Sequence, residues 1–350
     1  MSDAASDVFR ILDAAANRTR EGLRVIEDFA RFVLNDEDFS RSLKGHRHEL
    51  ALILSEFPLP RLLEARDTLH DVGTTISVPT EYQRTSTEDV VRAAFKRVQE
   101  ALRSLEEYSK VIDPKLAARF EQLRYQLYTT EKSFGRKTAV RERLRDQRVY
   151  LLVTAAACAG GMEAVVKGAL EGGVRLIQSR EKSLSDRDWL QIARKLREWT
   201  EAAGALLIIN DRPDIALLCN ADGVHVGQEE LTVHDARQIV GADRLIGVST
   251  HSIAQARQAV MDGADYLGVG PTFPSATKTF TDFPGLALIR EVRDEIEVPW
   301  FAIGGIQTNN VSQVCQAGAQ RVAVSSAICN SALPAEVARQ LIKTIESISE

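Results

Sequence analysis

The sequence lacks several features that would each define a class of protein. Its apolar runs reach only about seven or eight residues, whereas a membrane-spanning helix needs about 20. The first ten residues, MSDAASDVFR, lack the basic and apolar regions of a secretory leader. Lysine and arginine number 44 against 49 acidic residues, and the formal net charge is −5. Nucleic-acid and membrane-surface binders need a basic field, so we expect neither partner.

Cysteine is scarce and dispersed. The four cysteines form no C-x-x-C pair and lie far apart, at Cys158, Cys219, Cys315 and Cys329. This spacing predicts reduced, buried thiols of a cytoplasmic protein, with no catalytic or metal-binding role.

Glycine is scarce in the first part of the chain only. Four of the 21 glycines precede residue 141, and the other 17 follow it. A length of 350 residues suggests two domains at roughly 100–200 residues each. The stretch 136–148 is highly charged, with no apolar periodicity beyond Val140 and Leu144. We therefore predict a helical domain over 1–135, a linker helix over 136–148 and a second domain over 149–350.

The first domain contains an internal helix repeat. Apolar spacing predicts helices over 5–34, 36–55, 87–110 and 114–134, with a turn at Pro58 and Pro60. A ladder of arginine and glutamate recurs 79 positions later. Its first copy is Arg18, Glu21, Arg24 and Glu27, and its second copy is Arg97, Glu100, Arg103 and Glu106.

Two interpretations of this repeat stay open. The ladders could be solvated faces of an antiparallel bundle that serves as a dimerisation or docking module, which leaves a homo-oligomer open. They could instead form a buried network, symmetric in pairs, that binds an anion. The patch His70–Thr75 (HDVGTT) is where we expect chemistry, although no P-loop is present. Lys44, His46 and His48 are expected at the surface.

The second domain alternates strands and helices eight times, which predicts an α/β protein with a (β/α)8 TIM barrel. The expected strands are 149–154, 175–180, 205–210, 223–226, 245–250, 266–270, 300–304 and 321–325. A doubly wound sheet would need a G-x-G-x-x-G turn after the first strand, and residues 155–161 read AAACAGG instead.

Polar residues gather where the expected strands end, which is where barrels bind ligands. Three cations, Arg180, Lys182 and Lys278, are more than one monophosphate needs. Together with the hard oxygen ligands Asp211 and Glu230 they predict a pyrophosphate held with Mg²⁺.

A second anion site is predicted after the last two strands. Gly304–Gly305 and Ser325–Ser326 fit the usual barrel phosphate site, where backbone N–H groups cradle a phosphate. Two anion sites suggest that a diphosphate-bearing substrate is joined to a phosphate-bearing one. No catalytic triad or acid pair is indicated, so we expect the cations and the metal to stabilise departing pyrophosphate.

The second domain resembles thiamine-phosphate synthases. The stretch 172–182 reads GGVRLIQSREK, and 208–212, 221–230 and 266–271 match further family motifs in order and spacing. The resemblance implies a transferase that joins hydroxymethylpyrimidine diphosphate to hydroxyethylthiazole phosphate, with a dissociative mechanism in which pyrophosphate leaves first.

The resemblance also implies roles for individual residues. Arg180, Lys182, Lys278 and Ser249 would carry catalysis, and Asp211 and Glu230 would bind Mg²⁺. The substrate-binding set is Gln178, Ser179, Arg180, Glu181, Lys182, Asn210, Ser249, Ser275, Ala276, Thr277, Lys278, Gly305, Ser325 and Ser326. Two positions depart from the family pattern. Glu230 stands where aspartate is usual, and Ser275–Ala276 replaces the start of a T-x-T-K loop.

Residues 10–32 (RILDAAANRTREGLRVIEDFARF) are similar to a helical domain often fused ahead of these synthases. That family is proposed to be a noncanonical hydroxymethylpyrimidine-phosphate kinase, which implies ATP as a second cofactor. The alternative for the whole chain is a thiazole tautomerase-like barrel with a non-catalytic helical docking domain.

Overall fold

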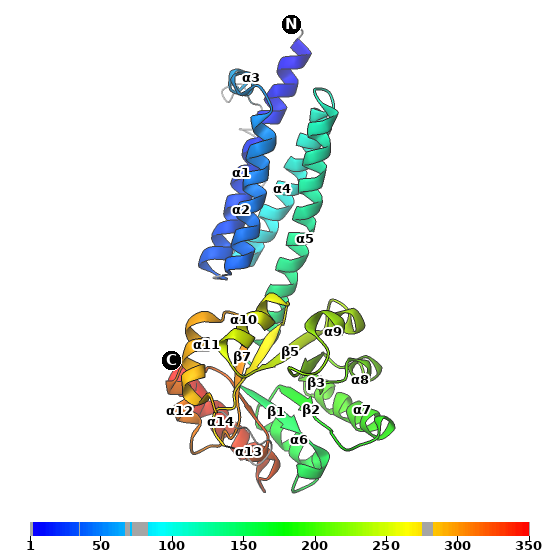
Figure 1. Cartoon of the computed structure of the whole chain (residues 1–350), viewed down its shortest axis with the longest axis vertical. Coiled ribbons are helices and arrows are strands. Elements are labelled where there is room, and N and C mark those ends of the chain that lie inside the picture. The colour runs from blue at the N-terminus through cyan, green and yellow to red at the C-terminus, as the bar shows by residue number, and fades with distance from the viewer. Residues whose placement is uncertain (1–2, 35, 67–70, 72–82, 275–282, 350) are drawn as a thin grey trace. The chain divides into compact units, whose positions relative to one another are not determined.

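The computed structural model describes residues 3–34, 36–66, 71, 83–274 and 283–349. The chain divides into two compact units, Met1–Gly135 and Arg136–Glu350 (Figure 1). Each unit is built around its own apolar core.

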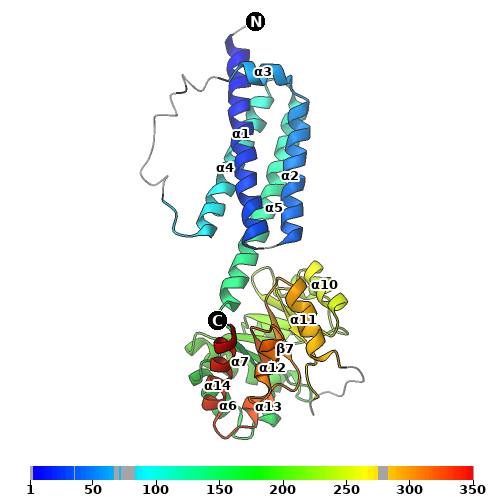
Figure 2. The same ribbon diagram turned by 90° about the vertical axis from the view of Figure 1, so that its left-hand side faces the viewer.

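Unit 1 is a bundle of long helices, which Figure 2 shows side by side. Its elements are α1 (Asp3–Phe32), α2 (Glu37–Ser55), α3 (Leu59–Glu64), α4 (Thr87–Ser109) and the first part of α5 (Pro114–Leu144). Side-chain caps set where helices begin. Asp36 accepts a hydrogen bond from the backbone N–H of Phe39 at 2.8 Å, and Ser86 accepts one from Asp89 at 3.2 Å. The four long helices are those expected from the apolar spacing.

Helices α1 and α4, which carry the two copies of the repeat, approach each other closely. A Cβ on Gly22 would lie 2.4 Å from Cγ2 of Val98, so any larger residue there would force Val98 to shift. Farther along, Phe134 of α5 lies 5.6 Å from Phe29 and 5.5 Å from Phe95, measured between ring centroids. The repeat therefore packs its apolar faces together around an aromatic cluster.

The Arg/Glu ladder divides into exposed and buried positions in the same way in both copies. Its first three residues are exposed, whereas the fourth, Glu27 or Glu106, is buried. Glu27 is paired with Arg47 of α2, and Glu106 lies 2.8 Å from Arg124 of α5. The first three residues of each ladder are therefore solvated, as one interpretation expects. The fourth is the carboxylate of a buried ion pair.

Unit 2 is a closed barrel of eight parallel strands in chain order. The strands are β1 (Val149–Val153), β2 (Leu176–Ser179), β3 (Leu206–Asn210), β4 (Gly223–Val226), β5 (Leu245–Thr250), β6 (Tyr266–Val269), β7 (Trp300–Ile303) and β8 (Val322–Val324). This confirms the predicted (β/α)8 TIM barrel behind a mainly helical first part.

Helices follow the strands and surround the barrel. They are η3 (Ala155–Ala157), α6 (Met162–Glu171), α7 (Asp186–Ala202), α8 (Pro213–Leu218), α9 (Val233–Val240), α10 (Ile253–Met261), α11 (Gly285–Glu295), α12 (Val311–Gln316), α13 (Ser326–Cys329) and α14 (Pro334–Ser349). The short helix α13, directly after β8, was not expected from the sequence, because four residues are too few to show a helical period.

Successive strand residues face opposite sides of the barrel wall. Leu151 and Ile177 pack against the surrounding helices, whereas Tyr150 and Leu176 belong to the cluster inside the barrel. The interior cluster also includes Val140 and Leu144, which lie on the part of α5 that belongs to unit 2.

The stretch expected to be a separate linker helix is continuous with α5 up to Leu144. Arg136 lies 3.0 Å from Asp265, just before β6, and Arg143 lies 2.5 Å from Asp222, just before β4. These ion pairs and the contacts of Val140 and Leu144 fix the end of α5 to the amino-terminal end of the barrel.

All four cysteines are buried and free of disulfides, as their dispersion predicts. Within the described ranges, no helix combines the length and the apolar character needed to cross a membrane.

Candidate functional site

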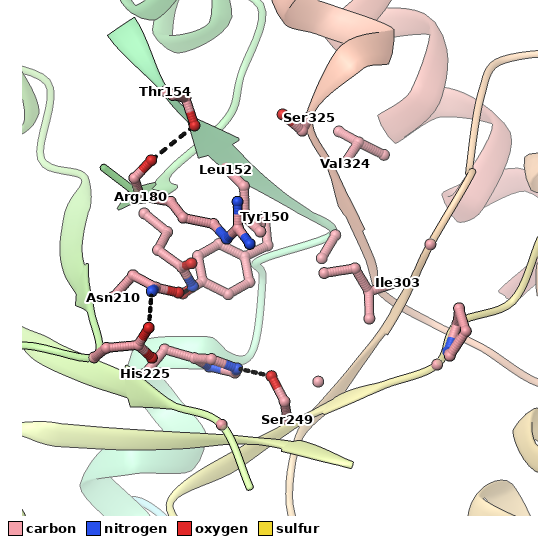
Figure 3. Close-up of a pocket in the computed structure, with 18 of the residues that line it drawn as sticks. Tyr150, Leu152, Thr154, Arg180, Asn210, His225, Ser249, Ile303, Val324 and Ser325 are labelled. Atoms are coloured by element: carbon pink, nitrogen blue, oxygen red, sulfur yellow. Dashed lines mark hydrogen bonds between the residues drawn. The ribbon is translucent and has the colours of Figure 1, made fainter. Parts of the chain in front are cut away.

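A cavity of about 490 Å³ opens at the carboxyl ends of the barrel strands (Figure 3). Ten of the residues predicted from the sequence line it: Gln178, Arg180, Lys182, Asn210, Asp211, Glu230, Ser249, Gly305, Ser325 and Ser326. The strand ends therefore converge on one site, as barrel geometry requires.

The cationic side of the cavity is built from the end of β2. The backbone N–H of Arg180 donates to Val153 at 2.8 Å, and its carbonyl accepts from the hydroxyl of Thr154 at 2.7 Å. The main chain that carries Arg180 is thus tied to β1 on both sides. Gln178 on β2 and Arg180, the first residue after β2, both line the cavity.

Two carboxylates stand next to these cations. Burial and the nearby charge of Glu230 raise the pKa of Asp211, while Lys182 and Arg180 act in the opposite direction. Asn210 donates to Asp211 at 2.5 Å, and Asp211 adopts a positive φ of 60°. A Cβ on Gly227 would lie 2.2 Å from a carboxylate oxygen of Glu230, so glycine makes room for this side chain.

The carboxylate pair fits a divalent cation that binds together with a phosphorylated ligand. Two like charges raise each other's energy, and a cation between them removes that cost. Within the part of the chain that the structure describes, no group of three or more His, Cys, Asp or Glu residues could hold a metal by itself. Mg²⁺ commonly uses one or two carboxylates and takes its other ligands from substrate phosphates and water.

A buried polar network joins the walls of the cavity. Gln178 donates to the hydroxyl of Tyr150 at 2.6 Å, and this hydroxyl lies 2.9 Å from that of Tyr266. Tyr266 lies 3.2 Å from Nδ1 of His225, whose Nε2 lies 3.0 Å from the hydroxyl of Ser249. The network fixes the orientation of Gln178 and Ser249, the two members that the sequence predicted.

Burial keeps the network uncharged at neutral pH. It lowers the pKa of His225 to about 4 and raises the pKa values of Tyr150 and Tyr266. Gln178 is itself buried, and its Oε1 has no hydrogen-bond partner among the described residues. A buried acceptor without a hydrogen-bond partner costs free energy, so a ligand that donates a hydrogen bond to this atom would be stabilised here.

The opposite side of the cavity is formed by the ends of β7 and β8. Gly305 has φ +63°, and a Cβ there would lie 2.6 Å from the carbonyl oxygen of Pro274. Asn310 donates to the carbonyl of Gly305 at 3.0 Å, and Gln307 donates to the hydroxyl of Ser326 at 2.9 Å. The backbone of Gly305 and the hydroxyl of Ser326 are therefore both held in place.

Two predicted substrate-binding residues do not line the cavity. Ser179 faces outward from β2, where its buried hydroxyl accepts from Trp189 Nε1 at 2.9 Å. Glu181 is buried and accepts from the backbone N–H of Ala155 at 2.6 Å. Both were taken from an unbroken sequence stretch. Ser179 points outward because only alternate residues of a strand reach the interior, whereas Glu181, which follows β2, is held by the N–H of Ala155. Ser275, Ala276, Thr277 and Lys278 lie outside the described residues.

In unit 1, the patch His70–Thr75 lies outside the described residues except for Asp71. Lys44 and His48 are exposed, as expected. His46 is half-buried, lies 2.9 Å from the hydroxyl of Thr130 and has its pKa lowered by burial. His46 also lines a polar cavity of about 270 Å³ between α2 and α5.

The barrel and its cavity define a class of protein: a (β/α)8-barrel enzyme with cationic, carboxylate and glycine-serine groups at the strand ends, where such enzymes bind phosphorylated small molecules. A family profile described as "Thiamine monophosphate synthase" matches residues 149–328, and one described as "ThiD2 family" matches residues 10–133.

Relatives with both parts are similar along nearly the whole chain. A thiamine-phosphate synthase of Rhodopirellula baltica is 45% identical over 338 residues, covering 94% of this chain and 90% of its own length. One of Gloeobacter violaceus is 47% identical over 321 residues and covers 92% of each chain. A solved thiamine phosphate pyrophosphorylase from Pyrococcus furiosus is 31% identical with TM-score 0.54, covering 59% of this chain and 98% of that one. The chain belongs to the thiamine-phosphate synthase family and is a transferase of thiamine biosynthesis.

Proposed function

We propose that the barrel cavity joins hydroxymethylpyrimidine diphosphate to hydroxyethylthiazole phosphate and releases pyrophosphate. The observation that carries this proposal is the presence of two anion-binding sides in one cavity. Arg180 and Lys182 lie on one side, and Gly305, Ser325 and Ser326 lie on the other. A diphosphate and a monophosphate bound there would bring their two rings together between them.

The buried network supports a site for the aminopyrimidine ring. Oε1 of Gln178 is oriented by the bond from its own amide to Tyr150, and it would accept from an exocyclic amino group. The hydroxyl of Ser249, fixed by neutral His225, would bind a second polar atom of the ring. Since His225 stays neutral, it adds no positive charge next to a pyrimidine cation.

The proposed reaction needs no general acid or base from the protein. The bond between the pyrimidine methylene carbon and the diphosphate oxygen breaks, and its electron pair leaves with pyrophosphate. The thiazole nitrogen then donates its lone pair to the methylene carbon. Arg180 and Lys182 would stabilise the charge that develops on the departing group. Lys278 is proposed for the same role from the family resemblance alone.

Asp211 and Glu230 are the proposed residues for Mg²⁺, with the diphosphate supplying further oxygen ligands. Bound Mg²⁺ would neutralise part of the negative charge on the leaving pyrophosphate. Glu230 is one methylene longer than the usual aspartate, and Gly227 supplies the space that its carboxylate occupies.

The experiment for the metal site is calorimetric titration of the full chain with Mg²⁺, with and without inorganic pyrophosphate. We expect pyrophosphate to tighten Mg²⁺ binding in the wild type, and Asp211→Asn to abolish the tightening. Asp235→Asn, an exposed carboxylate of α9, is the matched control. Equal Mg²⁺ affinity with and without pyrophosphate in the wild type would contradict the proposed site.

For unit 1, we propose that it phosphorylates hydroxymethylpyrimidine phosphate with ATP and so supplies the diphosphate. The support is the family resemblance of residues 10–32 and the profile match over 10–133. In the full chain carrying Arg180→Ala, diphosphate should accumulate from ATP and the monophosphate because coupling is blocked. No diphosphate from correctly folded protein would favour a non-catalytic dimerisation or docking module instead.

The thiazole tautomerase-like alternative is not favoured. The relatives that match both parts of the chain are thiamine-phosphate synthases. The cavity also retains Arg180, Lys182 and Asp211, which a reaction without a departing diphosphate would not need.

A further inference from the structure

The polar network inside the barrel depends on a glycine in the strand between two of its members. His225 of β4, Gly247 of β5 and Tyr266 of β6 are paired in register across three neighbouring strands. A Cβ on Gly247 would lie 2.2 Å from Cζ of Tyr266 and 2.4 Å from Nδ1 of His225. Both rings are buried, so a side chain at Gly247 would displace at least one of them. The glycine therefore makes room for the hydrogen bond that the two rings form across β5.

Tyr266 is the member of the network that lies behind the cavity wall. It is fully buried and is not among the described residues that line the cavity, whereas the other four members line it. Its hydroxyl lies 2.9 Å from that of Tyr150 and 3.2 Å from Nδ1 of His225. Tyr266 therefore connects the Gln178 end of the network to the Ser249 end without reaching a ligand itself.

The first hydrogen bond of the network sets the direction of the others. Gln178 donates to the hydroxyl oxygen of Tyr150, whose own hydrogen then has one acceptor among the described residues, the hydroxyl of Tyr266. Tyr266 in turn donates to Nδ1 of His225, so the single proton of this neutral imidazole lies on Nε2. Nε2 donates to Ser249, as Figure 3 shows, which leaves the hydroxyl hydrogen of Ser249 for a ligand.

The network thus presents an acceptor at one end and a donor at the other. The acceptor is Oε1 of Gln178, which has no partner among the described residues, and the donor is the hydroxyl of Ser249. A 4-aminopyrimidine has the complementary edge, because its amino group donates and the adjacent ring nitrogen accepts. A 4-oxopyrimidine has the opposite edge, with a carbonyl that accepts and a ring N–H that donates.

Binding the 4-oxo edge with both hydrogen bonds would require the whole network to reverse. The amide of Gln178 would turn over, and each hydroxyl and the imidazole would donate in the opposite direction. The two hydrogens of Nε2 would then occupy the buried position that now holds Oε1. Buried donors without partners cost free energy, so the reversed network is the less stable one before a ligand binds.

We propose that Tyr266 and His225 are positioning residues that make the barrel site select a 4-aminopyrimidine over its 4-oxo counterpart. This rests on the proposed function, in which Gln178 and Ser249 bind the pyrimidine ring. Without the hydroxyl of Tyr266, the hydrogen of Tyr150 has an acceptor only if the amide of Gln178 turns its oxygen toward it. The amide hydrogens then face the ring, which favours a carbonyl over an amino group.

The first measurement is the tautomer of His225 in the full-length protein without substrates. Nitrogen-15 NMR of protein labelled at histidine reports it, and loss of the signals in His225→Asn assigns them. We expect a neutral imidazole with its proton on Nε2. A proton on Nδ1 would overturn the proposal, because the network would then run in the opposite direction. This measurement requires no enzymatic activity.

The second measurement is inhibition of coupling, without ATP, by hydroxymethylpyrimidine monophosphate and by its 4-oxo counterpart. Neither inhibitor carries the diphosphate leaving group, so their Ki values report binding alone. In the wild type, we expect the Ki of the 4-amino compound to be about 100-fold lower than that of the 4-oxo compound. In Tyr266→Phe this ratio should fall to about tenfold or less, and Tyr150→Phe, a second break in the network, should lower it as well.

Thr250→Val is the matched control. The hydroxyl of Thr250 is also buried in the barrel wall, but it donates to the carbonyl of Gly268 at 3.1 Å, outside the network. This variant should lose stability and keep the wild-type ratio of Ki values.

Three further outcomes would overturn the proposal. The two Ki values could be equal in the wild type, folded Tyr266→Phe could keep the wild-type ratio, or it could lose affinity for both inhibitors equally, as a merely structural role would produce. If Tyr266→Phe does not fold, Tyr150→Phe and the tautomer of His225 decide. Failure of the wild type to couple its substrates would contradict the proposed function instead, and the tautomer would still test the direction of the network.

Discussion

The two units place their carboxylates in different surroundings. In unit 1, the buried carboxylates Glu27 and Glu106 each face an arginine from a neighbouring helix, so their charge is balanced within the protein. In unit 2, half-buried Asp211 and exposed Glu230 line the cavity together with Arg180 and Lys182, and the charge of Glu230 acts on Asp211. Breaking a buried ion pair is strongly destabilising, whereas charged groups that line a cavity can bind a charged ligand. This difference predicts that mutations will separate stability from activity.

The largest expected effect is on coupling activity. Arg180→Ala removes a cation that we place on the departing diphosphate, so we expect kcat/KM to fall about 1,000-fold, or roughly 4 kcal/mol. The melting temperature should stay within a few degrees of wild type, because Arg180 forms its hydrogen bonds to other described residues through its main chain, which the substitution keeps. Arg187→Ala, an exposed position of α7, is the matched control. Near-wild-type coupling would remove Arg180 from the site.

The next largest effect is on the stability of unit 1. Glu106→Ala leaves Arg124, which is 6% exposed, without its carboxylate and should cost about 3 kcal/mol of unfolding free energy. Glu27→Ala should cost less, because the side chain of Arg47 is 38% exposed and can turn to water. Denaturant unfolding of both variants measures this order. A larger loss of unfolding free energy in Glu27→Ala than in Glu106→Ala would contradict this account of the two ion pairs.

A smaller effect is expected at the phosphate side of the cavity. Gly305→Ala places a Cβ against the carbonyl of Pro274 and should raise the KM for the thiazole phosphate about 30-fold, or roughly 2 kcal/mol. Gly204→Ala is a closely matched control, with φ +62° and open space around the Cβ. It should lose some stability and leave this KM unchanged. Equal KM values in the two variants would argue against a phosphate at Gly305.

An effect of similar size is expected for the pH dependence of stability. The pKa of His225 is lowered by burial to about 4 in the folded protein, against an ordinary value of 6.5. The neutral form is favoured by folding, so this contribution is complete above pH 6.5 and is lost as the pH falls toward 4. Between pH 7.5 and pH 5 the loss should be about 2 kcal/mol. For His225→Asn, the unfolding free energy should fall between pH 7.5 and pH 5 by about 2 kcal/mol less than it does for the wild type.

How much the sequence could predict differed between the two units. Alternating strands and helices, and polar residues after each strand, were enough to predict the barrel and the residues that line its cavity. The exceptions have a physical cause. Ser179 does not reach the cavity because strand geometry sends only alternate side chains inward. Glu181, which follows the strand, is held instead by the backbone N–H of Ala155.

The network inside the barrel was missed for a related reason. Tyr150, His225 and Tyr266 sit within apolar strands, where they look like ordinary strand residues. A polar side chain at an inward position of a barrel strand is the signal that could have identified them. In unit 1, the sequence shows the spacing of the ladder. It does not show that only the fourth residue, Glu27 or Glu106, is buried, because that residue pairs with an arginine of a neighbouring helix. Sequence spacing within one helix cannot show that.

The most direct test of the central claim is the product balance of the reduced, full-length protein with Mg²⁺, preformed hydroxymethylpyrimidine diphosphate and hydroxyethylthiazole phosphate. We predict thiamine phosphate and pyrophosphate in equal amounts, little pyrophosphate without the thiazole phosphate, and about 1,000-fold slower formation of both in Arg180→Ala. Folded protein that yields no thiamine phosphate, or an Arg180→Ala variant that yields it at the wild-type rate, would contradict the account.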